Sequence, residues 1–207
     1  MTKESAPSAY HSEALGCAHE YLVPAVEDLV QRLRPGRIFD LGCGNGSVAN
    51  RLSRYAPVTG VDISESGVRI ANEAFPQLKV KVGSAYNNLS SLYGQFPLVV
   101  SLEVIEHLYD PRSFARNLFD LVEPGGSAVV STPYHGYWKN LSLAVSGRFD
   151  RHFTALWDGG HIKFWSVRTL RALLAEAGFA PISFMRVGRI PTFAKSMIAV
   201  ARKSAQG

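Results

Sequence analysis

Glycines and carboxylates at a characteristic spacing are the residues of this sequence that indicate chemistry most directly. Residues 40–46 read Asp-Leu-Gly-Cys-Gly-Asn-Gly, and Asp62 follows one further helical segment and strand along the chain. Glycines allow a ligand to approach the backbone closely, and a carboxylate at the end of a strand can accept hydrogen bonds from both ribose hydroxyls. These residues therefore predict a site for a cofactor that contains a nucleoside.

The spacing of the glycines narrows the class of cofactor. A dinucleotide site has the pattern G-x-G-x-x-G, in which a helix N-terminus holds a pyrophosphate. This chain has G-x-G-x-G instead, because Gly46 comes early and position 47 is Ser. Asp40 would repel a pyrophosphate, whereas it could attract an ammonium group directly or through water. The pattern therefore disfavours a nicotinamide-dependent dehydrogenase.

Three titratable side chains close together form a second candidate site. Glu103, Glu106 and His107 follow a predicted strand, and such a density of ionisable groups at the carboxyl end of a strand is typical of functional sites. They offer two oxygens and one nitrogen to a divalent cation, and His161 could bring a second imidazole. In the alternative interpretation, His107 only caps the following helix and the two glutamates are solvated.

Hydrophobic periodicity predicts the elements that position these residues. Strands that alternate with helices predict an α/β fold with a doubly wound parallel sheet. Ser64 is expected to cap one helix, and Gly178 to end another. We expect helices over residues 18–33, 47–55, 64–75, 111–122 and 166–177, and strands over 38–41, 58–61, 78–82, 97–102, 127–131, 182–187 and 197–201.

An aromatic-rich stretch at about 133–165 breaks this alternation. It is too long for a simple connection, so we expect an inserted helix plus loop that lies over the cofactor crevice. Ordinary packing of such a lid is one interpretation of its aromatic residues, and an apolar acceptor pocket is the other. The residues predicted to line that pocket are Tyr134, Trp138, Phe149, Phe153, Trp157 and His161.

The composition bounds the class of protein. With 207 residues, 46% hydrophobic and 19% charged, the chain is expected to form one globular domain. The net charge of +5 allows an anionic substrate or a transient contact with a membrane surface, but no lysine/arginine block indicates nucleic-acid binding. Without a signal peptide or a membrane-spanning stretch, a cytoplasmic location is expected. Two cysteines, Cys17 and Cys43, make no disulfide framework.

The motifs together resemble the class I S-adenosylmethionine-dependent methyltransferases. The resemblance implies a Rossmann-like, doubly wound, seven-stranded sheet that is mostly parallel, with an antiparallel last strand and helices on both faces. The methyltransferase domain would be residues 18–207, after a flexible N-terminal segment, residues 1–17, that could act as a lid over the cofactor. The matching segments are residues 40–46, 61–64, 101–111, 121–126, 131–133 and 175–179.

The resemblance also assigns residues to S-adenosylmethionine. It gives Asp62 to the ribose hydroxyls, and it suggests that Tyr10 covers the methionine part. The family usually has an acidic residue for the adenine amino group after the third strand, where this chain has Ser84, so the adenine assignment is weaker than the rest. The full set predicted to bind the cofactor is Asp40, Gly42, Cys43, Gly44, Asn45, Gly46, Asp62, Ile63, Ser84, Ala85, Leu102, Glu103 and Tyr10.

For catalysis, the resemblance points to His107 as the base that takes a proton from an acceptor hydroxyl, assisted by Glu103 and Glu106. The same Glu-x-x-Glu-His pattern with the later His161 is similar to two metal-dependent branches of the family, the ubiquinone-pathway O-methyltransferases and the enzymes that methylate the terminal ribose of small RNAs. In both, magnesium bound by these four residues would lower the pKa of the acceptor hydroxyl.

The small-molecule, ubiquinone-pathway-like branch is the better match, because the charge is modest and no RNA-binding domain is attached. We therefore expect methyl transfer to a hydroxyl, less readily an amine, of a small aromatic or lipidic metabolite, by a monomer or a homodimer. Two alternatives stay open: a metal-dependent ribose 2'-O-methyltransferase acting on RNA, and a non-catalytic module that only binds the cofactor.

Overall fold

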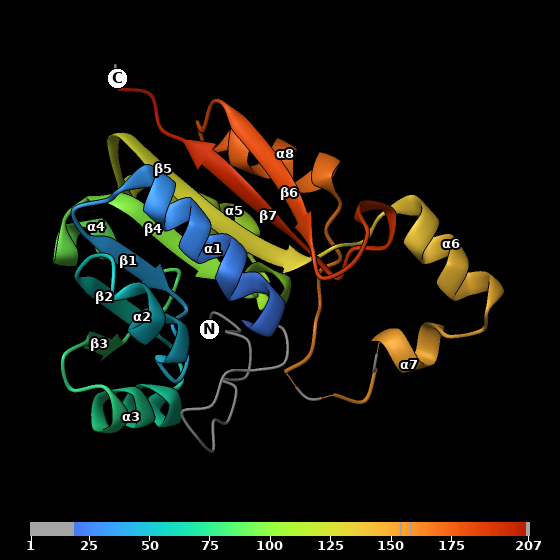
Figure 1. Ribbon diagram of the computed structural model, residues 1–207, viewed down its shortest axis with the longest axis horizontal. Helices are drawn as coiled ribbons and strands as arrows, with labels where there is room; N and C mark the ends of the chain where they lie inside the picture. The colour runs from blue at the N-terminus through green and yellow to red at the C-terminus, as the bar shows by residue number, and fades with distance from the viewer. Residues whose placement is uncertain (1–18, 154, 158, 206–207) are drawn as a thin grey trace.

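The computed structural model describes residues 19–153, 155–157 and 159–205, which form a seven-stranded sheet in the order β3-β2-β1-β4-β5-β7-β6 (Figure 1). All pairs from β3 to β5 are parallel, and β7 runs antiparallel to both of its neighbours. The predicted Rossmann-like sheet with an antiparallel last strand is thus confirmed. The strands are β1 (Ile38–Leu41), β2 (Val58–Asp62), β3 (Lys79–Val82), β4 (Phe96–Leu102), β5 (Val122–Pro133), β6 (Ile182–Val187) and β7 (Ser196–Arg202).

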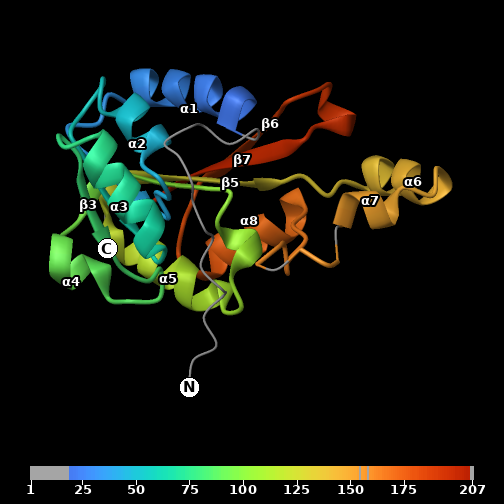
Figure 2. The same ribbon diagram turned by 90° about the horizontal axis from the view of Figure 1, so that it is seen from below.

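Helices cover both faces of the sheet, as expected for a doubly wound fold. Figure 2 shows α1 and α2 above the sheet and α5 and α8 below it. The α-helices are α1 (His19–Leu33), α2 (Ser47–Leu52), α3 (Glu65–Ala74), α4 (Leu89–Tyr93), α5 (Pro111–Leu121), α6 (Tyr137–Val145), α7 (Phe149–Phe153) and α8 (Val167–Glu176), with 3-10 turns η1 (Ile105–His107) and η2 (Pro191–Phe193).

Two hydrophobic cores, one on each face, hold the sheet. Successive side chains of a strand point to opposite faces, so Ile38 packs into the core under α1 while its neighbour Phe39 packs into the core under α5 and α8. Both residues are fully buried, as are Leu98 and Val99 in β4. Burial on both faces explains why these central strands read as continuous apolar runs rather than as alternating ones.

The helix boundaries differ from the predictions where the chain has little periodicity. Helix α2 ends at Leu52 rather than at 55, because residues 53–55 turn back toward β2. Helix α4 was not predicted, since five residues are too few to show a helical repeat. At other ends the expected caps are present: Ser64 accepts a hydrogen bond from the Gly67 amide at 3.2 Å and starts α3.

The aromatic-rich stretch contains two helices, α6 and α7, where one was expected. Figures 1 and 2 both show them projecting beyond the carboxyl end of β5, away from the β1–β2 end of the sheet. These two helices therefore lie away from the glycine turn, whereas residues 159–163 of the same stretch pack against the 3-10 turn that follows β4. The insert follows β5, and in the sheet β4 lies between β5 and β1. No helix among the described residues is long and apolar enough to cross a membrane.

Candidate active site

The glycine turn after β1 is tightly enclosed by the segments that follow β2 and β4. Gly42, Gly44 and Gly46 all have positive φ angles, at 88°, 53° and 75°. A Cβ atom on Gly42 would lie only 2.4 Å from Cγ2 of Val104, so that a side chain does not fit there. The Gly42 amide donates to the carbonyl of Val61 at 2.8 Å, which ties the turn to β2.

Asp62, at the end of β2, faces this turn. Its carboxylate accepts one hydrogen bond from the Gly44 amide at 2.7 Å and another from the Ser64 amide at 2.8 Å. Burial raises the pKa of Asp62, and the two amides oppose that rise. Because a carboxylate has about four lone-pair sites, two acceptor positions are left for another ligand.

Asp40 is the second carboxylate of this turn and is only 2% exposed. Its Oδ2 has no hydrogen-bond partner among the described residues. Burial, together with the nearby Asp62, raises the pKa of Asp40 to about 7. Asp40 is buried and Asp62 half-buried, and no described cation lies beside them, so a bound ammonium group would relieve the local excess of negative charge.

The other residues predicted to bind the cofactor lie in the loop after β3, in the glycine turn itself, or at the ends of β2 and β4. After β3, Ser84 Oγ accepts from the Tyr86 amide at 3.2 Å, and the Ala85 carbonyl accepts from Asn117 at 3.0 Å, so that loop is held by its own bonds. Tyr10 lies outside the described residues. Of the remaining predicted residues, Cys43, Asn45 and Leu102 are buried, whereas Ile63 is half-buried.

Glu103, directly after β4, is held in a strained conformation. Its φ of 56° is unusual for a residue other than glycine and costs about 1 to 2 kcal/mol. Its carboxylate accepts from Ser131 Oγ at 2.9 Å and from Ser196 Oγ at 3.4 Å. Burial raises the pKa of Glu103 to about 7, although both hydroxyls and the charge of Lys139 oppose the rise.

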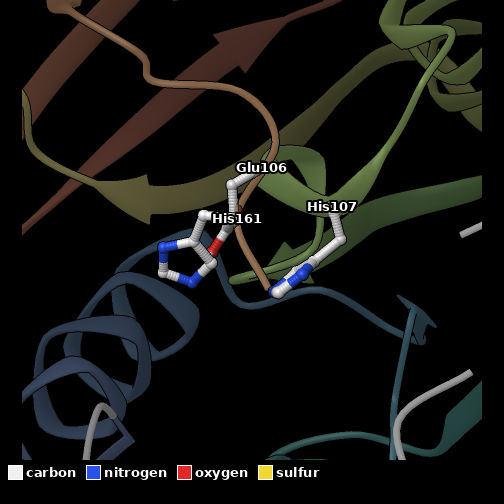
Figure 3. A group of neighbouring side chains, drawn as sticks. All are labelled: Glu106, His107 and His161. Carbon is white, nitrogen blue, oxygen red and sulfur yellow. Dashed lines mark ion pairs between the residues drawn. The ribbon is translucent and has the colours of Figure 1, made fainter. Parts of the chain in front are cut away.

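Glu106, His107 and His161 come together from two separate segments (Figure 3). Each offers one ligand atom, and these atoms all lie within 4.8 Å of one another. Glu106 is fully buried, and neither of its carboxylate oxygens has a hydrogen-bond partner among the described residues. Burial, and then the charge of Glu103, raise the pKa of Glu106. Glu103 itself, predicted as a fourth ligand, is outside this group because its oxygens face Ser131 and Ser196.

The two imidazoles of the group are suited to different roles by their contacts. His107 Nδ1 lies 2.9 Å from the Gly159 carbonyl, an acceptor, so Nδ1 carries the proton and Nε2 keeps a free lone pair. Burial, with the neighbouring His107 and His152, lowers the pKa of His161 to about 4, so this ring is neutral near pH 7. Its segment is fixed by the Ile162 amide, which donates to the Glu106 carbonyl at 2.9 Å.

A cavity of about 440 Å³ opens beside His161, between the insert and the segment that joins β6 to β7. Of the residues predicted for an acceptor pocket, only Phe153 and His161 line it. Tyr134 packs against the core, Phe149 stacks on Phe153, Trp157 contacts the rings of His107 and His161, and Trp138 is 60% exposed.

Known proteins match both the sequence and this fold. A family model described as a methyltransferase domain matches residues 18–183. Ubiquinone biosynthesis O-methyltransferase from Azorhizobium caulinodans is 32% identical over 178 residues, which are 80% of this chain and 68% of that enzyme. The chain belongs to the class I S-adenosylmethionine-dependent methyltransferases.

Other relatives of this methyltransferase agree. Ubiquinone biosynthesis O-methyltransferase from Ruegeria pomeroyi is 30% identical over 155 residues, and that match covers 70% of this chain but only 60% of the relative. Magnesium protoporphyrin IX methyltransferase from Synechocystis PCC 6803, solved with bound SAH, has a TM-score of 0.69 at 21% identity, over 88% of this chain and 82% of that one. The methyltransferase domain of bacterial CtHen1 has a TM-score of 0.65 at 21% identity, over 87% and 97%. These two structures show the shared fold.

The sequence reasoning missed the charged residues that line the cavity of this methyltransferase. They are separated by long stretches of chain and form no charge block, so no local pattern reveals them. Only the folding of the insert against the segment between β6 and β7 brings them together. The cationic lining residues are Lys139, Arg148, Arg189 and Lys195.

Proposed function

We propose that this chain transfers a methyl group from S-adenosylmethionine to a hydroxyl of a small aromatic acceptor, with a divalent cation such as magnesium or manganese held by Glu106, His107 and His161. The observation that carries the proposal is the buried carboxylate of Glu106, which has two imidazoles beside it and no cation among the described residues, and to which the Thr132 hydroxyl offers a nearby donor. A buried, unpaired carboxylate is costly unless a cation compensates it.

The methyl donor would lie against the glycine turn. Asp62 has two acceptor positions left for the ribose hydroxyls, because the Gly44 and Ser64 amides already fix its orientation. Asp40 would stay ionised near the ammonium group of the methionine part, since a positive charge lowers the raised pKa of a buried carboxyl.

The donor set fits a divalent cation in its chemistry. One carboxylate and two imidazoles are available, because the bond from His107 Nδ1 to the Gly159 carbonyl leaves Nε2 as the ligand atom and His161 has a lowered pKa. When bound, such a cation lowers the pKa of an acceptor hydroxyl. The carbonyl of Gly159 would keep the His107 ring in one tautomer and orientation, as second partners of metal-binding histidines commonly do.

In the proposed reaction, the acceptor oxygen gives up its proton and forms a bond to the methyl carbon while the bond from that carbon to the sulfonium sulfur breaks. The sulfonium becomes a neutral thioether. With His107 Nε2 bound to the cation, the proton would leave to solvent; without a cation, Nε2 would be the group that takes it. The protein contributes mainly orientation, since the oxygen, carbon and sulfur must lie in line.

Metal binding can be tested without knowing the acceptor. Titration with Mn²⁺, followed by loss of the free-ion EPR signal, should show binding that Mg²⁺ displaces, and Glu106→Gln should weaken it by about tenfold or more. Glu65→Gln, which removes an exposed glutamate on α3, is the matched control and should bind like the unaltered chain. Equal binding by Glu106→Gln and the unaltered chain would contradict the metal assignment.

Turnover supplies the second test. Release of S-adenosylhomocysteine in the presence of a fractionated metabolite extract should stop with excess chelator and return with Mg²⁺. Full activity in chelator would leave methyl transfer in place with His107 as an unaided base, and no release with any fraction would favour a module that only binds the cofactor.

A further inference from the structure

We infer that the cavity beside His161 binds an acidic group of the acceptor, so that the acceptor is a small molecule carrying a carboxylate or a phosphate as well as its hydroxyl. This inference rests on the proposed function, because His161 is taken there as part of the reacting centre. The cavity is lined by four Lys or Arg side chains and three imidazoles, with no carboxylate among the lining residues.

Three of the four positive charges of the cavity have no carboxylate partner among the described residues, and only Lys139 interacts with one, Glu103. Arg148 and Arg189 have no side-chain hydrogen bond or ion pair among the described residues. Lys195 lies over the ring of Tyr21, with Nζ 5.0 Å from the ring centroid, and pairs with no described carboxylate. Unpaired cations around one cavity repel one another, and an anion between them would relieve that repulsion.

Lys139 is the innermost of these cations. Its Nζ donates to the Tyr134 carbonyl at 2.8 Å and to the Lys195 carbonyl at 3.5 Å, which leaves one of its three hydrogens for a ligand. Burial, together with the positive charge of Arg189, lowers the pKa of Lys139 to about 8. The two cations thus act on the same space, and a single acidic group could bind both.

The cavity also has the volume and the apolar surface that such an acceptor needs. A volume of about 440 Å³ falls in the range of small-molecule sites, which are about 300 to 1,000 Å³. Phe153 and Phe164 supply apolar surface, and His161 forms part of both the cavity and the Glu106 group. An acceptor whose ring contacts the two phenylalanines would present its hydroxyl toward His161 and its acidic group toward Lys139 and Arg189.

Titration calorimetry with matched probes tests this inference on the full chain. A dihydroxybenzoate should bind about tenfold or more tightly than the dihydroxybenzyl alcohol of the same shape, because a charge-assisted contact to arginine is worth about 1.5 to 3 kcal/mol. Phenyl phosphate, tested beside the benzoate, distinguishes a phosphate site from a carboxylate site. Arg189→Gln should remove most of the preference for the acid, since Arg189 is exposed and its replacement leaves no described partner unpaired.

Arg151→Gln is the control, because Arg151 is exposed like Arg189 but lies in α7 and does not line the cavity. It should keep the preference for the acid. The inference would be overturned by an acid that binds no tighter than the alcohol, by equal losses in the two arginine variants, or by a short single-stranded RNA that outcompetes both acids through Arg189. Binding of S-adenosylhomocysteine, measured in the same samples, separates the two proposals: its absence would refute the proposed function, whereas the acid titration tests the cavity alone.

Discussion

Three carboxylates near the site differ in what surrounds them, and the differences correspond to different tasks. The half-buried Asp62 has two backbone donors, the buried Asp40 has one oxygen without a partner, and the buried Glu106 has no hydrogen bond to either oxygen among the described residues. A buried carboxylate becomes more costly as its donors decrease in number. Asp62 is therefore ready to accept hydroxyl hydrogens, whereas Asp40 and Glu106 call for positive charge.

Replacing Asp62 tests the ribose assignment. Asp62→Ala should weaken S-adenosylhomocysteine binding by about tenfold or more, because a hydrogen bond to a charged group is worth about 1.5 to 3 kcal/mol. Calorimetry measures the affinity. Asp62→Asn, which keeps one acceptor oxygen for the Gly44 amide, separates loss of the ligand contact from loss of the turn and should give an intermediate affinity. Unchanged affinity in both variants would refute the assignment.

The elements were predictable from the sequence where burial imposes a pattern. Apolar runs predict the central strands, and the closely spaced glycines predict the turn, where their φ angles are positive. The hydroxyl of Ser64 predicts the cap that starts α3. The insert was not predictable in the same way, because α6 and α7 have no buried residues and so no pattern to reveal where they pack. The cavity and its cations depend on that packing, and they could be recognised only from the structure.

Helix α8 gives a test at the scale of one element. Ser166 Oγ accepts from the Thr169 amide at 3.3 Å, and Thr169 Oγ1 accepts from the Ser166 amide at 3.0 Å, which makes a reciprocal cap directly after the segment that carries His161. Ser166→Ala should lower the free energy of unfolding by about 0.5 to 2 kcal/mol in urea denaturation. Ser166→Asp keeps an acceptor and should lose less, so equal losses in the two variants would show that the cap itself is not responsible.

For the whole molecule, the acids with raised pKa values and the histidines with lowered pKa values make stability depend on pH in opposite directions. Burial raises the pKa of Asp40, Glu103 and Glu106, so these groups favour folding less as the pH rises through their folded pKa values. Burial lowers the pKa of His135 and His161 to about 4, so these groups favour folding less as the pH falls below their usual value. The opposing slopes overlap between about pH 4 and 7, where they partly cancel. A single variant is needed to separate them.

Asp40→Asn provides that separation, because it removes one carboxyl from a site where the folded chain holds the proton more tightly than the unfolded chain does. The pKa of Asp40 rises from 3.8 to about 7 on folding, so the unaltered chain loses stability from this group as the pH rises across that range. The variant has no carboxyl at this position and therefore does not lose this stability. Its free energy of unfolding, relative to the unaltered chain, should therefore increase with pH by up to about 4 kcal/mol and level off above about pH 7.

Urea denaturation of the cofactor-free chain at a series of pH values measures this difference. Asp150→Asn, at an exposed position in α7, controls for the loss of one negative charge. A difference for Asp40→Asn that stays constant between about pH 4 and 7 would contradict a raised pKa. In that case Asp40 would already be ionised and compensated within the folded chain, and its proposed attraction for the ammonium group of the methyl donor would lose its physical basis.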